Sequence, residues 1–210
     1  MKSFKEFINE SMNECDDVHV RSGRLLTQEQ VMCNEIYEKA GDMPAVMFTD
    51  VVGSSQMWSD DTLTMKSRID NHFELITEIA EKYNGFVVKS IGDAFMIYFE
   101  GKDALEMAIE CGIEIIKHEA LPLRVGICEG PMQEKVYVLQ DAKLRDFFGN
   151  AVNVASRMES KVADPEGIAF SSMDVVSKDL IEKYGAEKLS PKKVPNLKGA
   201  SVDTVYKIKA

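Results

Sequence analysis

The stretch Gly85–Glu100, which reads GFVVKSIGDAFMIYFE, most strongly limits what the chain can fold into. Two runs rich in β-branched and aromatic residues flank the dipeptide Gly92-Asp93, and this combination predicts a β-hairpin with a tight turn. Lys89 lies in the first strand and Asp93 lies at the turn. Gly-Asp is a common turn dipeptide, so the hairpin alone predicts structure and not function.

A second acid interrupts another apolar stretch. Residues 45–55 read AVMFTDVVGSS, and a nearly continuous apolar run of this kind favours a strand buried on both faces. Asp50 lies near the end of that strand. Because a buried carboxylate must be paired or bound to a metal, Asp50 is a candidate site residue.

Helices and strands follow one another in the remaining chain. Apolar residues at helical spacing predict a short helix in residues 1–13, a capped helix over 27–39, and helices over 58–83, 102–118, 150–162 and 173–184. Further strands are predicted at 122–127, 135–139, 168–171, 187–189 and 202–208, and a charged, exposed segment is predicted at 142–146.

The order β-α-β-β-α-β predicts an α/β (α+β) fold with a ferredoxin-like core. Further elements would extend this core at its C-terminus, and short helices would precede it. Gly41 and Pro44 end the helix over 27–39. We therefore expect an N-terminal helical segment, 1–42, followed by one main domain, 43–210.

Composition excludes several classes of protein. The net charge of −10 over 210 residues argues against a nucleic-acid-binding protein, which usually carries a basic excess. The four cysteines are scattered without metal-ligand spacing, which is typical of reduced thiols in the cytosol. No apolar run reaches the length of a membrane span, and there is no secretory h-region. We expect a cytoplasmic protein with neither a nucleic-acid nor a membrane partner.

The first ten residues, MKSFKEFINE, resemble the N-terminal peptide of some tailed-phage structural and internal proteins. That resemblance would make the protein phage-encoded and place it in the cytoplasm of a host cell.

Four motifs together resemble the class III nucleotidyl cyclase catalytic domain. They are FTDVVGSS (48–55), KSIGDAF (89–95), LRVGICEG (123–130) and DFFGNAVNVASRMES (146–160). They follow the order and spacing of that family from about Ala45 to the C-terminus. The resemblance implies cyclisation of a nucleoside triphosphate, in which the ribose 3′-hydroxyl attacks the α-phosphorus and pyrophosphate leaves.

The resemblance assigns metal binding to Asp50 and Asp93, together with Val51. Hard oxygen ligands select Mg²⁺ or Mn²⁺, and two such ions at each site suit the charge that develops in phosphoryl transfer. The turn Val51, Val52, Gly53, Ser54, Ser55 leads into a helix, and its amides would hold the substrate phosphates. Lys198 would contact the terminal phosphates.

The same resemblance assigns recognition of the base to Lys89 and Asp146, because lysine and aspartate at these positions accompany adenine in the family. Lys89 can donate to adenine N1, and Asp146 can accept from the exocyclic amine, whereas guanine presents the reverse pattern. Asn153 would orient the ribose, and Arg157 would stabilise the transition state. In the family, metal residues come from one protomer and the other residues from its partner. This implies a homodimer with two shared sites.

An adenylate cyclase that converts ATP to 3′,5′-cyclic AMP and pyrophosphate is therefore our leading interpretation. A cyclase that uses GTP or a pyrimidine triphosphate is the alternative among enzymes. A diguanylate cyclase should carry GG[D/E]EF where this chain reads IGDAF. A non-catalytic, nucleotide-binding cyclase-like module is the alternative from another class, and such a module would be expected to have lost a metal aspartate or the arginine.

Overall fold

A computed structural model of the chain describes residues 31–36, 43–139, 142–189 and 202–209. The chain divides into two compact units. The larger unit spans Tyr37–Met132 and Phe148–Ala210, and the smaller unit spans Met1–Ile36 and Gln133–Phe147.

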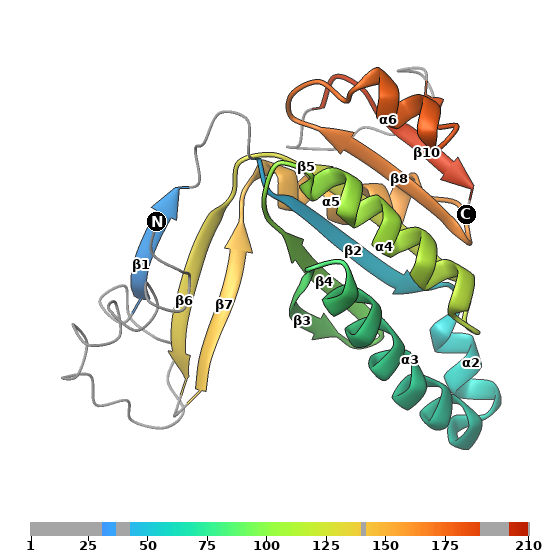
Figure 1. The fold of residues 1–210 in the computed structure, drawn as a ribbon. Coiled ribbons are helices and arrows are strands. Elements are labelled where there is room, and N and C mark those ends of the chain that lie inside the picture. Colours follow the sequence, from blue (N-terminus) through green and yellow to red (C-terminus); the bar gives the residue numbers. More distant parts are fainter. Residues whose placement is uncertain (1–30, 37–42, 140–141, 190–201, 210) are drawn as a thin grey trace. The chain divides into compact units, whose positions relative to one another are not determined.

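The larger unit is built on a seven-stranded sheet with the strand order β3-β4-β2-β5-β8-β10-β9 (Figure 1). The strands are β2 (Ala45–Val51), β3 (Phe86–Ile91), β4 (Ala94–Phe99), β5 (Leu123–Glu129), β8 (Gly167–Ser172), β9 (Glu187–Lys188) and β10 (Tyr206–Lys209). The helices are α2 (Ser54–Asp60), α3 (Thr62–Lys82), α4 (Ala104–His118), α5 (Asn150–Lys161) and α6 (Lys178–Lys183).

The predicted ferredoxin-like core is confirmed. The elements β2, α3, β3, β4, α4 and β5 follow the β-α-β-β-α-β order, and their strands lie in the spatial order β3-β4-β2-β5 with antiparallel pairing throughout. Strand β8 then pairs with β5 in parallel and extends the sheet toward the C-terminal strands. The predicted hairpin is the β3–β4 pair.

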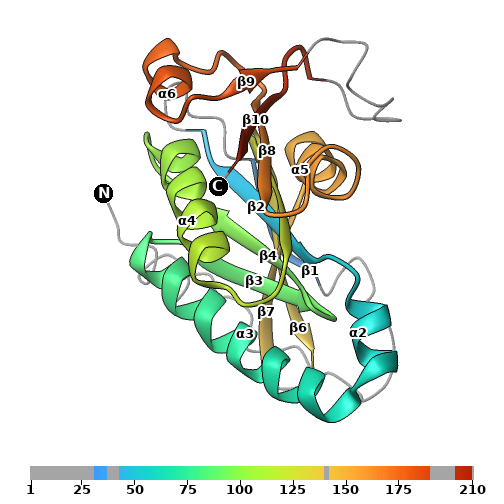
Figure 2. The same ribbon diagram turned by 90° about the vertical axis from the view of Figure 1, so that its right-hand side faces the viewer.

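The two faces of the sheet are covered by different helices. Figure 2, which views the sheet nearly edge-on, shows α3 and α4 on one face and α5 on the other. Fully buried side chains such as Met47, Ile97 and Ile127 belong to the core under α3 and α4. On the other face, a Cβ at Gly126 would lie 2.2 Å from the Ala155 carbonyl oxygen. The absence of a side chain at Gly126 therefore lets α5 pack directly on β5.

The smaller unit contains a three-stranded sheet with the order β1-β6-β7, formed by β1 (Val31–Ile36), β6 (Gln133–Leu139) and β7 (Ala142–Phe148). The predicted helix over 27–39 is wrong at Val31–Ile36, because these residues pair with β6 in an antiparallel ladder. The ladder supplies backbone partners that the local capping pattern could not reveal. The charged segment 142–146, for which no strand was predicted, belongs to β7, and Leu144 within it is exposed.

Two predicted helices differ in extent from those observed. The helix over 58–83 is divided at Asp61, whose backbone is extended and whose side chain accepts a hydrogen bond from the Thr64 amide. The helix over 173–184 is reduced to α6, because the Met173 amide donates to the Glu129 carbonyl and Ser177 caps the helix that follows.

The N-terminal helix of 1–13 and the phage-like peptide lie outside the described residues, so the division at residue 42 stays a prediction. Among the helices that the structure describes, none combines the length and the apolar character required to cross a bilayer.

Candidate active site

A β-bulge in the hairpin determines where Lys89 lies. Val87 pairs with Ile97 and Lys89 pairs with Met96, so Val88 is the extra residue on β3. Cross-strand partners share a face of the sheet, and a one-residue shift moves a side chain to the opposite face. Ile97 belongs to the core under α3 and α4, whereas Met96 pairs with Phe48 on the neighbouring strand.

The same register continues across the sheet to α5. Phe48 also pairs with Gly126, the position that approaches the α5 backbone. The row of Lys89, Met96, Phe48 and Gly126 therefore lies on the α5 face. Without the bulge, Lys89 would lie opposite Phe95, on the face covered by α3 and α4.

Asp50 lies on the α5 face as well, two residues beyond Phe48 along β2. It pairs across strands with Arg124 of β5, and an Arg124 guanidinium nitrogen lies 2.6 Å from Asp50 Oδ2. Both side chains are about 30% exposed. The guanidinium supplies the positive partner that a carboxylate at the end of a buried strand requires.

Arg124 also faces a second carboxylate. Its Nε lies 3.3 Å from Glu159 Oε1 of α5, yet both atoms are buried without a hydrogen-bond partner among the described residues. The contact is therefore an ion pair with poor hydrogen-bond geometry. Burial, reinforced by the charge of Asp50, raises the pKa of Glu159 to about 7 despite the attraction of Arg124.

The raised pKa of Glu159 predicts a pH-dependent stability. Between the ordinary carboxyl pKa and about pH 7, the native protein binds more protons at this site than the unfolded chain does. The contribution of Glu159 to stability should therefore fall as pH rises through this window and level off above it, by about 3 kcal/mol in all. Glu159→Gln should flatten this decline when urea unfolding is followed in chelator from pH 5 to pH 8. Equal slopes for both proteins would contradict the assignment.

Asp93 lies at the tip of the hairpin, after Gly92 in a left-handed conformation with φ 65°. The last pair of the β2–β4 ladder is Thr49 with Phe95, so Asp50 and Asp93 lie within two residues of the same end of that ladder. The Asp93 Oδ2 atom is buried and has no hydrogen-bond partner among the described residues. A buried carboxylate oxygen without a donor fits the ligand of a cation.

The donor set agrees with a hard divalent ion. Among the described residues, no group of three or more His, Cys, Asp or Glu side chains is arranged to hold a metal ion. Mg²⁺ is commonly held by one or two carboxylates together with substrate phosphates and water. A pair of aspartates at one end of two neighbouring strands suits this kind of site.

The turn predicted to hold phosphates connects β2 to α2. Gly53 has φ 74° and precedes Ser54, the first residue of α2. The Val52 amide already donates to the Pro122 carbonyl at 2.8 Å. Phosphate contacts from this turn would therefore come from the other amides, since first-turn amides have no acceptor within the helix.

Helix α5 presents the predicted pair Asn153 and Arg157 on one side and its apolar side chains on the other. Ala151, Ala155, Met158 and Val162 are buried. Asn153 is exposed and Arg157 is half-buried. The four-residue spacing therefore directs both side chains away from the face that packs on β5.

The two other predicted substrate residues do not belong to the described part of the larger unit. Asp146 belongs to β7 of the smaller unit, where its Oδ1 accepts a hydrogen bond from the Phe147 amide at 2.9 Å. Lys198 lies outside the described residues.

The charged partners Arg124 and Glu159 were missed by the sequence analysis. Both lie inside quoted motifs, and Arg124 is a charge within a strand whose other residues are mostly apolar. That is the same signal that singled out Asp50.

The sequence model of a protein family, the adenylate and guanylate cyclase catalytic domain, matches residues 36–209 of the chain. The chain belongs to this family. Relatives include the receptor-type guanylate cyclase gcy-23 of Caenorhabditis elegans, 27% identical over 88% of this chain and 19% of the relative. The adenylate cyclase of Podospora anserina is 31% identical over 61% of this chain and 7% of the relative. The chain thus spans at most a fifth of the length of these two relatives.

The fold of this cyclase domain is shared with the catalytic core of a rhodopsin-guanylyl cyclase with converted specificity, solved in complex with ATPαS. The two structures superpose with a TM-score of 0.69 at 22% identity, over 84% of this chain and 98% of the other. The class III cyclase fold expected from the four motifs is therefore confirmed. Because the relatives include both adenylate and guanylate cyclases, the family does not fix the base.

Proposed function

We propose that this cyclase domain is an adenylate cyclase that converts ATP to 3′,5′-cyclic AMP and pyrophosphate. The observation that carries the proposal is the pair Asp50 and Asp93 at one end of the β2–β4 ladder, where a buried oxygen of Asp93 has no hydrogen-bond partner in the part of the chain that the structure describes. In the reaction, a bond forms between the ribose 3′-oxygen and the α-phosphorus. The bond from the α-phosphorus to the pyrophosphate oxygen breaks, and the hydroxyl proton is released.

Asp50 and Asp93, with Val51, would hold two Mg²⁺ or Mn²⁺ ions. When bound, such ions neutralise charge on the phosphates and activate the attacking oxygen. Arg124 Nη2 lies 2.6 Å from Asp50 Oδ2, so a positive charge holds this proposed ligand in place. The amides of the turn 51–55 other than that of Val52, together with Lys198, would hold the β- and γ-phosphates.

Asn153 would orient the ribose, and Arg157 would stabilise the phosphoryl charge of the transition state. Their place on the exposed side of α5 favours contact with a substrate held by a second protomer. We therefore propose a homodimer in which each site takes its metal ligands from one protomer and Asn153 and Arg157 from its partner.

Lys89 and Asp146 would select adenine. The bulge at Val88 supports this role for Lys89, because it moves the lysine to the face of the sheet covered by α5, the helix that carries Asn153 and Arg157 of the same protomer. A lysine donates to adenine N1, and an aspartate accepts from the exocyclic amine. GTP is the competing substrate, since the relatives include guanylate cyclases.

Competition between ATP and GTP tests this choice of base. With Mn²⁺ and both triphosphates present at equal concentration, cyclic AMP should be the main product. Lys89→Glu combined with Asp146→Cys should lower the preference for ATP over GTP by about 100-fold, because each mispaired polar group costs about 1–3 kcal/mol. Lys135→Glu, a change of the same kind elsewhere on the chain, is the control. Cyclic GMP as the main wild-type product would refute the adenine assignment, and an unchanged preference in the double variant would show that these two residues do not read the base.

A further inference from the structure

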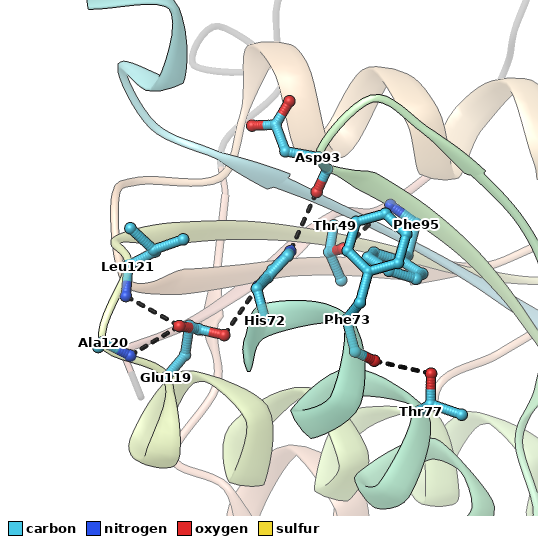
Figure 3. Close-up of polar contacts among 9 residues, drawn as sticks. All are labelled: Thr49, His72, Phe73, Thr77, Asp93, Phe95, Glu119, Ala120 and Leu121. Atoms are coloured by element: carbon cyan, nitrogen blue, oxygen red, sulfur yellow. Dashed lines mark hydrogen bonds and ion pairs between the residues drawn. The ribbon is translucent and has the colours of Figure 1, made fainter. Parts of the chain in front are cut away.

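A buried histidine connects the hairpin turn to the body of the domain. His72 lies on α3 and its side chain is fully buried. Its Nδ1 lies 2.7 Å from Glu119 Oε2, and its Nε2 lies 3.1 Å from the main-chain oxygen of Asp93. Figure 3 shows the ring between these two partners, with the Asp93 carboxylate directed away from it.

The partner of His72 is itself held firmly. Glu119 directly follows α4, and its Oε1 accepts hydrogen bonds from the amides of Ala120 and Leu121 at 2.8 and 3.0 Å. Burial tends to raise the pKa of Glu119, but the hydrogen bonds from His72 and from these amides outweigh it and keep the pKa below its usual value. Glu119 is thus itself fixed in place, and it holds one edge of the ring.

The ring has little freedom to turn. Phe95 packs against it edge-on, with centroids 5.5 Å apart, and Phe73 packs edge-on against Phe95 at 4.6 Å. A carbonyl oxygen can only accept, so the Asp93 oxygen receives a hydrogen bond donated by Nε2. One side chain therefore connects α3, the segment after α4 and the tip of the β3–β4 hairpin.

We propose that His72 is a positioning residue that holds the Gly92-Asp93 turn in the geometry required for metal binding. This inference rests on the proposed function, because it takes Asp93 as a metal ligand. A two-residue turn that begins with a left-handed glycine has few contacts of its own, whereas a metal ligand must be held to within a fraction of an ångström. Partners that orient a ligand commonly change metal affinity by about 10–100-fold when they are removed.

His72→Ala tests the proposal, with Ile76→Ala as the matched control. Ile76 lies one turn further along α3 and is also fully buried, but its side chain is apolar. Both variants should be less stable than the wild type. Only His72→Ala should weaken Mn²⁺ binding, by about 10-fold, in electron paramagnetic resonance titrations with ATP present. It alone should also speed amide hydrogen exchange at residues 91–94 in the metal-free protein.

Equal Mn²⁺ affinity and equal exchange at the turn in the two variants would overturn the proposal. If His72→Ala does not fold, the same two measurements are made on His72→Gln and Glu119→Ala. Wild-type Mn²⁺ affinity and wild-type exchange in both of these variants would overturn the proposal. These readouts do not depend on turnover. A wild-type protein that binds Mn²⁺ but forms no cyclic nucleotide would refute the proposed function and leave the role of His72 to be decided by the comparison with Ile76→Ala.

Discussion

Cyclase turnover is expected to fall about 1,000-fold when Asp93 is replaced by asparagine, since losing a metal ligand removes several kcal/mol of transition-state stabilisation. Asparagine keeps the size of the side chain and its place in the turn but removes the charge. The buried Oδ2 of Asp93 has no hydrogen-bond partner among the described residues, so its loss breaks no hydrogen bond of that atom. The thermal midpoint of the metal-free variant should therefore equal or exceed that of the wild type.

Asp103→Asn provides the control for this experiment. Asp103 is exposed, lies before α4 in the segment that follows the same hairpin, and makes no side-chain capping bond. Its replacement should leave turnover within about twofold of the wild type, because exposed substitutions away from special features have small effects. Turnover in Asp93→Asn that stays within tenfold of the wild type at saturating Mn²⁺ would contradict a metal-binding role for Asp93.

Mixing two inactive variants is expected to restore activity if the sites are shared between protomers. Arg157→Ala should lower turnover by about 100–1,000-fold, as does the loss of one donor to a charged transition state. Asp93→Ala should lower turnover by at least the same factor. In an exchanged 1:1 mixture about half of the dimers are mixed, and each mixed dimer has one intact site, so about a quarter of wild-type activity should return.

The matched control for complementation is a mixture of Asp50→Asn with Asp93→Ala. Both residues would come from the same protomer at each site, so no mixed dimer has an intact site and activity should not return. Subunit exchange is monitored independently by native mass spectrometry of differently labelled chains. Exchange without recovery in the mixture of Asp93→Ala and Arg157→Ala would show that each site is built within one protomer.

The larger unit was predictable because its signals are local. The hairpin, the apolar strand that carries Asp50 and the buried stripe of α5 each depend on residue types within one short segment. The ferredoxin-like order of the core follows from those segments, and the structure confirms it.

The features that escaped prediction depend on pairing between distant segments. The strand at Val31–Ile36 forms on β6, about a hundred positions away along the chain. The bulge at Val88 is defined only by its register against β4. From the local sequence, His72 is only one residue of an amphipathic helix. Its role becomes visible only when the fold places Glu119 and the Asp93 carbonyl beside it. In each case the decisive partner lies outside the local sequence.

The product formed by the purified wild-type protein tests the proposed cyclase activity most directly. It is incubated with Mn²⁺ and each of the four ribonucleoside triphosphates in turn, and the products are identified by mass spectrometry, with Asp93→Asn as the control. The wild type should form 3′,5′-cyclic AMP and an equal amount of pyrophosphate from ATP, and the variant should form neither. The absence of a cyclic product from all four triphosphates would contradict the proposed activity.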